Sequence, residues 1–421
     1  MLSGASTRNP MFSRRANRLG EQPIADLMTQ ALARPELISL AAGFVDNESL
    51  PVDIAGDVVR EFLSDPRQAQ ASLQYGSNAG DPQLRAAILD RWYDPAEGFS
   101  VDQVVISPGS NQLLFLLSDI LLDPGDIILC ASPTYLVFLG IMEAIGGRAI
   151  GVETDQQGMV PESLAQQLQL LQQSGDLHRV KAIYLVPYHD NPAARTMTWE
   201  RKSQIAEIAQ HWSNEDPIYV LMDSAYQELH YCGEQTPRLL ASETDAEWLV
   251  EIGTFSKCFS PGLRVGWAVL PESLLDPLLG IKGYLDFGAP NFAQQLAAGV
   301  LSSGRLEPHL SKLRHQYLLK RDAMLDALEE HMSGFPGVHW ETPNGGLYVW
   351  LHLPNGMTAG PEGVLLHHAL EEGVLYVPGQ YCFPKEGAAA EENTIRLSFG
   401  VQSAERIEAG IAALGRALRR A

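Results

Sequence analysis

Short apolar segments alternate with amphipathic ones through the middle of the chain. Seven apolar runs have the length of a buried strand, and most of the segments between them repeat apolar residues with the period of a helix. Strands separated by helices form a mostly parallel sheet with helices on both faces. The predicted strands are Val104–Ile106, Ile127–Cys130, Arg148–Val152, Val180–Pro187, Ile218–Met222, Trp248–Ile252 and Val265–Leu270.

Helical spacing recurs before and between these strands. Asp81 followed by Pro82 is a typical helix start, because the Asp side chain caps the first turn and Pro fits the first helical position. The predicted helices are Ile24–Leu32, Val52–Leu63, one that begins at Pro82, Gln112–Leu122, Tyr135–Ala144, Pro161–Gln173 and Trp199–His211.

The pattern changes after Leu270. A helix at Ala289–Leu301 and a long charged helix near Leu306–His331 lead into a segment where strands and helices no longer alternate regularly. This order predicts a second, smaller α+β unit. Its predicted strands are Val338–Trp340, Leu347–Leu353, Val374–Val377 and Thr394–Ser398, and its predicted helices are Gly360–Glu372 and Ala404–Leu418.

The length supports this division, since 421 residues exceed what one hydrophobic core usually holds. We predict an α/β fold with a three-layer α/β/α domain around a seven-stranded sheet, plus a smaller α+β domain. The predicted boundaries are 1–48 for an N-terminal arm and part of the small domain, 49–300 for the large domain and 301–421 for the small domain with its bridging helix.

Charge and composition exclude several classes of function. The formal net charge of −21 opposes general binding to nucleic acid or to an anionic membrane, and no apolar run is long enough to span a bilayer. The four cysteines lie far apart without a CxxC pair, which favours a reducing cytoplasm. Arginines and the lack of an apolar core in the first 20 residues indicate a flexible basic arm. His367 and His368 have no partner at zinc-binding spacing, so we predict no metal.

Ligands of open parallel sheets bind beyond the carboxyl ends of the strands. The residues that follow successive predicted strands offer an anion cradle, aromatic rings, an amide, a carboxylate, a phenol and a lysine. Each of these groups is weak evidence alone, and their convergence on one edge of the sheet makes them candidates. They include Gly109, Ser110 and Asn111, then Tyr135, Asn191, Asp223 and Tyr226, and finally Ser256, Lys257 and Arg264.

Lys257 and Arg264 are the only cations between Trp248 and Gly280. Two cations in an apolar, Gly- and Ser-broken connection need an anionic or carbonyl partner. A lysine that is partly desolvated beside another cation has a lowered pKa and can act as a Schiff-base nucleophile. The residues alone are equally compatible with a surface loop that carries two solvated charges.

Three further features have two interpretations each. Gly109-Ser110-Asn111 opens a helix, where free N–H groups favour a phosphate, although a plain helix cap has the same sequence. Asp223 ends an apolar strand and suits either a cationic partner such as a protonated pyridine nitrogen or a helix cap. Arg396 lies inside an apolar strand and suits a carboxylate ligand or a structural ion pair.

Taken together, these residues resemble the aspartate aminotransferase superfamily, the fold type I pyridoxal-phosphate enzymes of aminotransferase class I/II. The resemblance runs from about Ile38 to the C-terminus and is nearest to the branch of 2-aminoadipate, kynurenine, aromatic and valine–pyruvate aminotransferases. The matching pieces, in family order, are Tyr75-Gly76, Gly109-Ser110-Asn111, Asn191-Pro192, Asp223-Ser224-Ala225-Tyr226, Ser256-Lys257, Pro261-Gly262-Leu263-Arg264, Pro378-Gly379 and Arg396.

The resemblance implies a cofactor, pyridoxal 5′-phosphate, and a role for each matching residue. Lys257 would bind the cofactor as a Schiff base and then carry the proton. Asp223 would pair with the pyridine nitrogen, Asn191 and Tyr226 would bind the phenolic oxygen, and Tyr135 would stack on the ring. The phosphate would be held by Gly109, Ser110, Asn111, Ser256 and Arg264, with Tyr75 of the neighbouring subunit, and the substrate by Arg396, Asn191 and Gly43.

The implied activity is a ping-pong transfer of an amino group from an α-amino acid to a 2-oxo acid, 2-oxoglutarate or pyruvate, in a cytoplasmic homodimer with shared sites. One alternative is a β-lyase or cyclopropane-forming synthase that uses the same residues. A remote alternative is an aminotransferase-like transcriptional regulator, which needs a DNA-binding domain that the roughly 37 residues before Ile38 are too few to form.

The chain departs from the family pattern at several positions. The family often reads Asn-Pro-Thr-Gly where this chain reads Asn191-Pro192-Ala193-Ala194, so we expect an altered turn after Asn191. Asp190 and Asn111 stand where glutamine is common, and Thr254 stands where serine is common. These departures leave the expected cofactor chemistry intact and bear on the substrate pocket.

Overall fold

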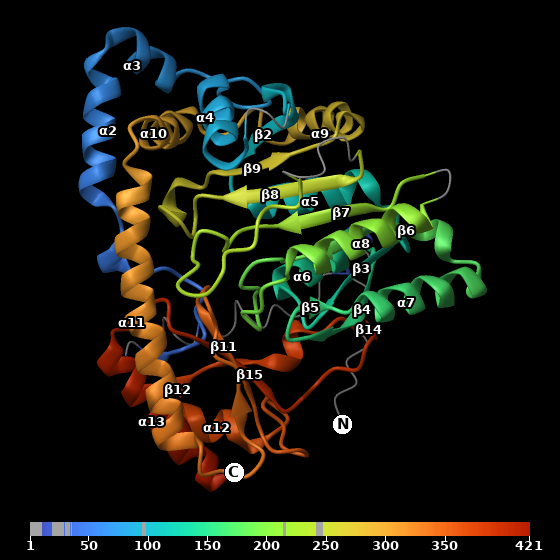
Figure 1. Cartoon of the computed structure of the whole chain (residues 1–421), viewed down its shortest axis with the longest axis vertical. Coiled ribbons are helices and arrows are strands. Elements are labelled where there is room, and N and C mark those ends of the chain that lie inside the picture. Colours follow the sequence, from blue (N-terminus) through green and yellow to red (C-terminus); the bar gives the residue numbers. More distant parts are fainter. Residues whose placement is uncertain are drawn as a thin grey trace.

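The computed structural model describes residues 11–18, 29, 34, 36–94, 98–213, 216–240 and 247–421. A large sheet with helices on both faces lies beside a smaller unit of strands and helices, and the long helix α11 (Leu306–Met332) runs alongside both (Figure 1). The predicted α/β architecture is confirmed.

The seven predicted strands form the centre of the large sheet. Their order is β4-β3-β6-β7-β8-β9-β2, and β9 alone runs antiparallel to its neighbours. Two short strands that the sequence did not predict, β5 (Gly158–Met159) and β14 (Glu386–Gly387), pair with β4 and bring the sheet to nine strands. The central strands are β2 (Val104–Ser107), β3 (Ile127–Ser132), β4 (Arg148–Asp155), β6 (Val180–Leu185), β7 (Tyr219–Asp223), β8 (Leu249–Thr254) and β9 (Gly266–Val269).

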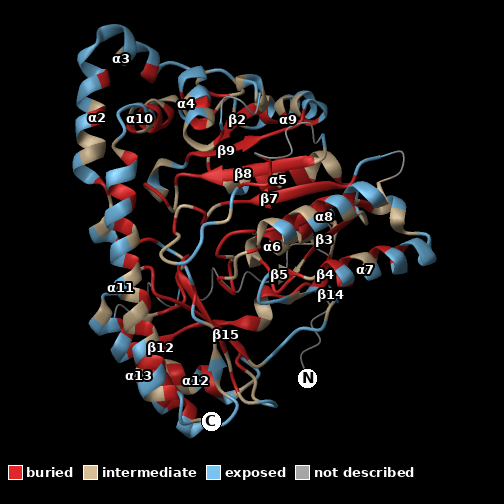
Figure 2. Ribbon diagram, viewed as in Figure 1, coloured by how far each residue is buried: buried red, intermediate tan, exposed pale blue. Residues whose placement is uncertain are grey.

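Alternate residues of each strand pack into different helical layers, and the strands are buried on both faces (Figure 2). In β2, for example, Val105 belongs to one core and Ile106 to the other. One core includes α5 (Ser110–Leu121), α6 (Leu136–Ile145) and α9 (Glu272–Leu285). The other includes α2 (Val52–Ser64), α4 (Pro82–Trp92), α7 (Pro161–Ser174), α8 (Trp199–Trp212) and α10 (Asn291–Ser302).

The smaller unit contains a four-stranded antiparallel sheet in the order β10-β11-β15-β13. These strands are β10 (His339–Trp340), β11 (Tyr348–His352), β15 (Thr394–Ser398) and β13 (Val377–Pro378), and the unit's helices are α12 (Val364–Glu371) and α13 (Ala404–Arg420). The N-terminal strand β1 (Ile38–Ser39) pairs with β12 (Val374–Leu375), so this early segment joins the C-terminal unit. The domain boundaries near residues 48 and 300 stay a prediction.

Asp81 caps α4 through the backbone amide of Leu84, as expected. Other elements differ from the prediction. The sequence pattern did not reveal α3 (Pro66–Leu73), or α9, which contains Pro277 in its interior. The helix predicted at Ile24–Leu32 lies almost entirely outside the described residues. Short 3-10 helices occur at Asn47–Ser49, Val101–Gln103, Leu177–Arg179, Pro261–Leu263 and Gly379–Cys382.

Two kinds of feature are absent from the described part of the chain. No helix there is long and apolar enough to cross a membrane. No group of three or more His, Cys, Asp or Glu side chains in those ranges has the arrangement of a metal site.

Candidate functional site

A cavity of about 320 Å³ lies where carboxyl ends of the large sheet face the smaller sheet. It is lined by nearly all the residues that the sequence predicted, with Gly109 and Tyr75 outside the lining. The predicted residues that line it are Gly43, Ser110, Asn111, Tyr135, Asn191, Asp223, Tyr226, Ser256, Lys257, Arg264 and Arg396.

Lys257 lies in the short segment after β8 and extends into this cavity. Its Nζ donates a hydrogen bond to the carbonyl oxygen of Gly43 at 2.6 Å. Burial, followed by the nearby Arg396 and Arg264, lowers the pKa of Lys257 to about 8, against an opposing effect of Asp223. The side chain is therefore a partly desolvated amine whose neutral, nucleophilic form is present near neutral pH.

Asp223 ends β7 and is buried at the cavity wall. Its carboxylate accepts hydrogen bonds from the Tyr184 hydroxyl at 3.1 Å and from the backbone amide of Ala225 at 3.3 Å. Burial raises the pKa of Asp223 to about 6, although these two donors and Lys257 lower it. A carboxylate in this state is stabilised by any further cation or donor that enters the cavity.

The segment that carries Asp223 is held from behind by residues that the sequence did not single out. Ser224 donates to Glu251 of β8 at 2.8 Å, and Glu251 forms a buried ion pair with Arg238. The hydroxyl of Tyr93 also donates to Glu251 at 2.9 Å. An acid inside a strand signals such a partner, but only the fold shows that the partner is Arg238.

An anion cradle forms at the N-terminus of α5. Gly109 precedes this helix with φ +86° and offers no side-chain cap, so the first-turn amides can serve a ligand. Arg264 adopts φ +51° and packs directly over Gly109, where a Cβ would come within 2.3 Å of its Nη2. Its Nη1 lies 3.4 Å from Ser256 Oγ. Gly266 allows the approach of β9, since a Cβ there would lie 2.4 Å from the Ser110 amide nitrogen.

Arg396 reaches the cavity from β15 of the smaller sheet and is almost fully buried. Its two terminal nitrogens donate to Asn191 Oδ1 and to the carbonyl oxygen of Ala41, both at 2.7 Å. Its Nε is buried without a hydrogen-bond partner, and its hydrogen bonds to described residues go to an amide and a carbonyl rather than to a carboxylate. A desolvated guanidinium without a counter-ion is a binding site for an anion.

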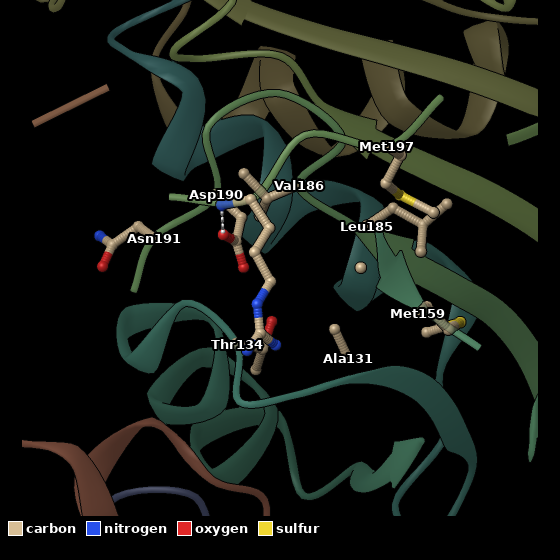
Figure 3. A pocket seen from close by; sticks show the side chains of 10 residues that line it. Ala131, Thr134, Met159, Leu185, Val186, Asp190, Asn191 and Met197 are labelled. Atoms are coloured by element: carbon tan, nitrogen blue, oxygen red, sulfur yellow. Dashed lines mark hydrogen bonds between the residues drawn. The ribbon is translucent and has the colours of Figure 1, made fainter. Parts of the chain in front are cut away.

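Asn191 is positioned by a tight turn between Asp190 and Arg195. Asp190 accepts a hydrogen bond from the Arg195 amide at 2.6 Å, and Ala194 donates to the Asp190 carbonyl at 2.7 Å. Figure 3 shows Asn191 on the other side of Asp190 from Met159 and Met197, and all four residues line a small pocket that adjoins the cavity at Asn191. Ala194 has φ +57°, a conformation that favours glycine, so the chain forms a glycine-like turn without glycine.

Three tyrosines contribute rings or hydroxyls to the cavity. Tyr135 is the N-cap residue of α6, and its hydroxyl donates to Asn111 Oδ1 at 3.4 Å. The hydroxyls of Tyr226 and Tyr348 lie 3.0 Å apart. Tyr348 was not predicted, because an aromatic residue in an apolar strand looks like an ordinary core residue.

Tyr75 lies away from this cavity, on the surface. It is 79% exposed and its ring contacts Phe287 edge-to-face at 5.5 Å between centroids. His367 and His368 also lie on the surface, beside Glu371.

Known proteins are similar to this chain in sequence and in fold. The family described as "Aminotransferase class I and II" matches residues 35–414. An aromatic-amino-acid aminotransferase from Thermococcus litoralis is 32% identical over 97% of this chain and 94% of its own length. A 2-aminoadipate transaminase from Thermus thermophilus is 31% identical over 97% of this chain and 96% of its own. The structure of a Pyrococcus horikoshii kynurenine aminotransferase in complex with PMP superimposes with a TM-score of 0.89 and 32% identity, covering 97% of both chains.

The lowered pKa of Lys257 predicts selective chemistry in the ligand-free protein. At pH 7, a lysine with a pKa of about 8 has roughly 300 times more neutral amine than one at 10.5. We therefore expect reductive methylation with formaldehyde to label Lys257 on the order of 100-fold faster than the exposed Lys385, with half-maximal rate near pH 8. Peptide mass spectrometry measures both rates.

Lys202 provides an internal control for access. Burial also lowers its pKa, to about 7, but its side chain is fully enclosed, so it should label slowly despite the shift. Equal labelling of Lys257 and Lys385 would contradict the lowered pKa.

Proposed function

This chain belongs to the class I and II aminotransferases and is a pyridoxal-phosphate-dependent enzyme that transaminates amino acids; on that premise, we propose the parts that its own residues play. Lys257 is the attachment point of the cofactor and the carrier of the transferred proton. Asp223, Asn191, Tyr226, Tyr135 and the α5 cradle hold the cofactor. Arg396 binds the carboxylate of an α-amino acid and, in the second half of a ping-pong cycle, that of 2-oxoglutarate or pyruvate.

The donor set of the cavity fits the cofactor at each of its polar groups. The observation that carries the proposal is Asp223, a buried carboxylate with a raised pKa that one protonated pyridine nitrogen would stabilise. The uncapped N-terminus of α5, Ser256 and Arg264 suit the phosphate. The amide of Asn191 and the hydroxyl of Tyr226 suit the phenolic oxygen.

When bound, pyridoxal phosphate supplies an aldehyde carbon for the amino group and a ring that accepts the electron pair left by the α-proton. The protein residues provide the rest. Lys257 would take the proton from the substrate Cα and deliver it two bonds away, to the former aldehyde carbon of the cofactor, which requires the neutral amine that its lowered pKa provides. Asp223 stays ionised against the protonated ring nitrogen, and Tyr135 limits the tilt of the ring.

The lining beyond these residues favours donors with apolar or aromatic side chains. Most of it is apolar and is supplied by Ala41, Ala42, Phe44, Leu136, Val137, Val186, Ala225 and Pro261. Lys257, Arg264 and Arg396 are the only cations among the described lining residues, and the proposed roles occupy all three. A second carboxylate on the substrate would therefore find no dedicated partner there.

We also propose a homodimer, in which Tyr75 reaches the phosphate cradle of the partner subunit. An exposed apolar surface supports this, because large patches of this kind mark interaction sites. It is formed by Leu73, Tyr75, Tyr284, Leu285 and Phe287, of which Tyr284 is 99% exposed. The four cysteines are free thiols, which supports the proposed cytoplasmic location.

Arg396→Ala should raise KM for amino donors about 100-fold while leaving cofactor retention nearly unchanged, because it removes the buried partner of the carboxylate. Arg264→Ala is the matched variant, and it should release the cofactor with a smaller effect on KM. Steady-state kinetics and equilibrium dialysis of the cofactor separate the two. An unchanged KM in Arg396→Ala would place carboxylate binding elsewhere.

Phenylalanine and leucine should react in the first half-reaction at least about tenfold faster, in kcat/KM, than 2-aminoadipate, because the apolar lining offers no partner for a second carboxylate. The measurement is loss of the visible absorption of the bound cofactor with no acceptor present. Recovery on adding 2-oxoglutarate or pyruvate identifies transamination, whereas ammonia release without recovery identifies elimination. A faster reaction with 2-aminoadipate would refute the apolar preference.

Paired Tyr284→Asp and Phe287→Asp substitutions should convert a dimer into a monomer, because two charges would be buried in the apolar interface. Analytical ultracentrifugation measures the mass. Tyr75→Phe should leave the dimer intact yet weaken cofactor binding about tenfold, through one lost hydrogen bond to phosphate. A monomeric unsubstituted protein would refute both the interface and the shared site.

A further inference from the structure

Tyr348 connects the smaller sheet to the cavity. It is the first residue of β11, it is 1% exposed, and it lines the cavity between the large and small sheets. Its ring lies under the guanidinium of Arg396, with 4.5 Å between the Arg396 Cζ and the ring centroid. Its hydroxyl has two neighbours, Tyr226 and Asn191.

The direction of the hydrogen bonds around this hydroxyl follows from Arg396. A guanidinium can only donate, so the oxygen of the Asn191 amide, which lies 2.7 Å from Arg396 Nη1, must accept. The amide nitrogen of Asn191 then faces Tyr348, at 3.5 Å from its hydroxyl oxygen. Because an amide nitrogen can only donate, Tyr348 accepts at this contact.

The hydrogen of Tyr348 then has one acceptor. The hydroxyl oxygen of Tyr226 lies 3.0 Å away, and no other hydrogen bond of Tyr348 occurs among the described residues. The opposite direction, from Tyr226 to Tyr348, would leave the buried hydrogen of Tyr348 without an acceptor, which is unfavourable. Tyr226 therefore accepts from Tyr348 and keeps its own hydrogen for the cavity.

We infer that Tyr348 is a positioning residue whose hydroxyl completes a one-way chain of hydrogen bonds from Arg396 through Asn191 to Tyr226, and so directs the Tyr226 hydrogen at the phenolic oxygen of the cofactor. The inference rests on the proposed roles of Asn191 and Tyr226. The chain starts at the arginine proposed to bind the substrate carboxylate and ends at the cofactor-facing hydroxyl.

The lack of a side chain at Gly43 is independent evidence that the Tyr348 hydroxyl has a specific place. A Cβ at position 43 would lie 2.5 Å from the Tyr348 hydroxyl oxygen but 3.6 Å from Cζ of the same ring. The hydroxyl alone therefore excludes a side chain at position 43. The Gly43 carbonyl accepts the hydrogen bond of Lys257, so the hydroxyl also sets how closely this backbone approaches the lysine.

The main test is the pH titration of the visible absorption of the bound cofactor in Tyr348→Phe. The variant keeps the ring beneath Arg396 and removes only the hydroxyl. A hydrogen directed at the phenolic oxygen stabilises negative charge there and lowers the pH midpoint, so Tyr348→Phe should raise the midpoint by about one unit. Tyr376→Phe is the matched control, since it removes an equally buried hydroxyl that donates to Ala359 away from the cavity.

A second test uses the steric prediction. Gly43→Ala should displace the Tyr348 hydroxyl and reproduce the raised midpoint, with a several-fold loss of cofactor affinity. Combining Gly43→Ala with Tyr348→Phe should restore most of that affinity, since the nearest ring atom then lies at ordinary contact distance. Thermal unfolding of each variant shows whether the fold is retained.

The outcomes separate this inference from the proposed function. An unchanged midpoint in Tyr348→Phe, or an equal shift in Tyr376→Phe, overturns the directing role while Lys257 and its cofactor absorption remain. If Gly43→Ala loses the same cofactor affinity with and without Tyr348→Phe, the steric role of the hydroxyl is overturned. Absence of any Lys257-dependent absorption in the unsubstituted holoenzyme would instead refute the proposed function.

Discussion

An excess of positive charge around one cavity is the constraint on which this site depends. Lys257, Arg264 and Arg396 surround one cavity, whereas Asp223 is the only carboxylate in its described lining. Arg396 is buried and Lys257 is half-buried, so the desolvation of these two cations is unfavourable unless anions enter, whereas Arg264 is exposed. Arg396 shows this most clearly, because its hydrogen bonds go to an amide and a carbonyl rather than to an acid. Under the proposed roles, a phosphate and a substrate carboxylate would supply the missing charge, so ligand binding would also neutralise the cavity.

The fold concentrates these charges through close backbone approaches. Gly109 and Gly266 let β9 and the start of α5 come together, which places Arg264 directly over the uncapped helix. Arg396 arrives from a different sheet, at the position in β15 that pairs with Trp350 of β11. The cavity therefore exists only when the two sheets keep their relative position. The helix α11 connects the large unit to the smaller one, and β1, which precedes α2 of the large unit, pairs with β12 of the smaller unit.

The sequence was sufficient to predict the large sheet and most of the cavity lining, because strand periodicity is local and parallel strands end at one edge. It was insufficient where a residue acts through contacts distant in sequence. In the sequence Tyr348 looks like a core residue, and only the fold shows that its hydroxyl lies beside Asn191 and Tyr226. Glu251 likewise looks like an acid in an unsuitable place, and only the fold shows its ion pair with Arg238. The helix α9 was missed because Pro277 lies inside it. The turn at Ala194 keeps a left-handed residue without glycine, which local propensity disfavours.

The segment at residues 41–46 shows a further limit of sequence reasoning, because it acts through its backbone. The carbonyl oxygens of Ala41 and Gly43 accept from Arg396 and Lys257, and a backbone carbonyl carries no signal in the residue type. Its far end is fixed differently, since Asp46 pairs with Lys320 at 2.7 Å and its amide donates to Tyr317. Under the proposed role of Lys257, attachment of the cofactor to its Nζ would replace the hydrogen bond to Gly43, whereas the contacts of Ala41 and Asp46 do not involve the lysine. These contacts would hold the segment at the cavity when the lysine changes partner.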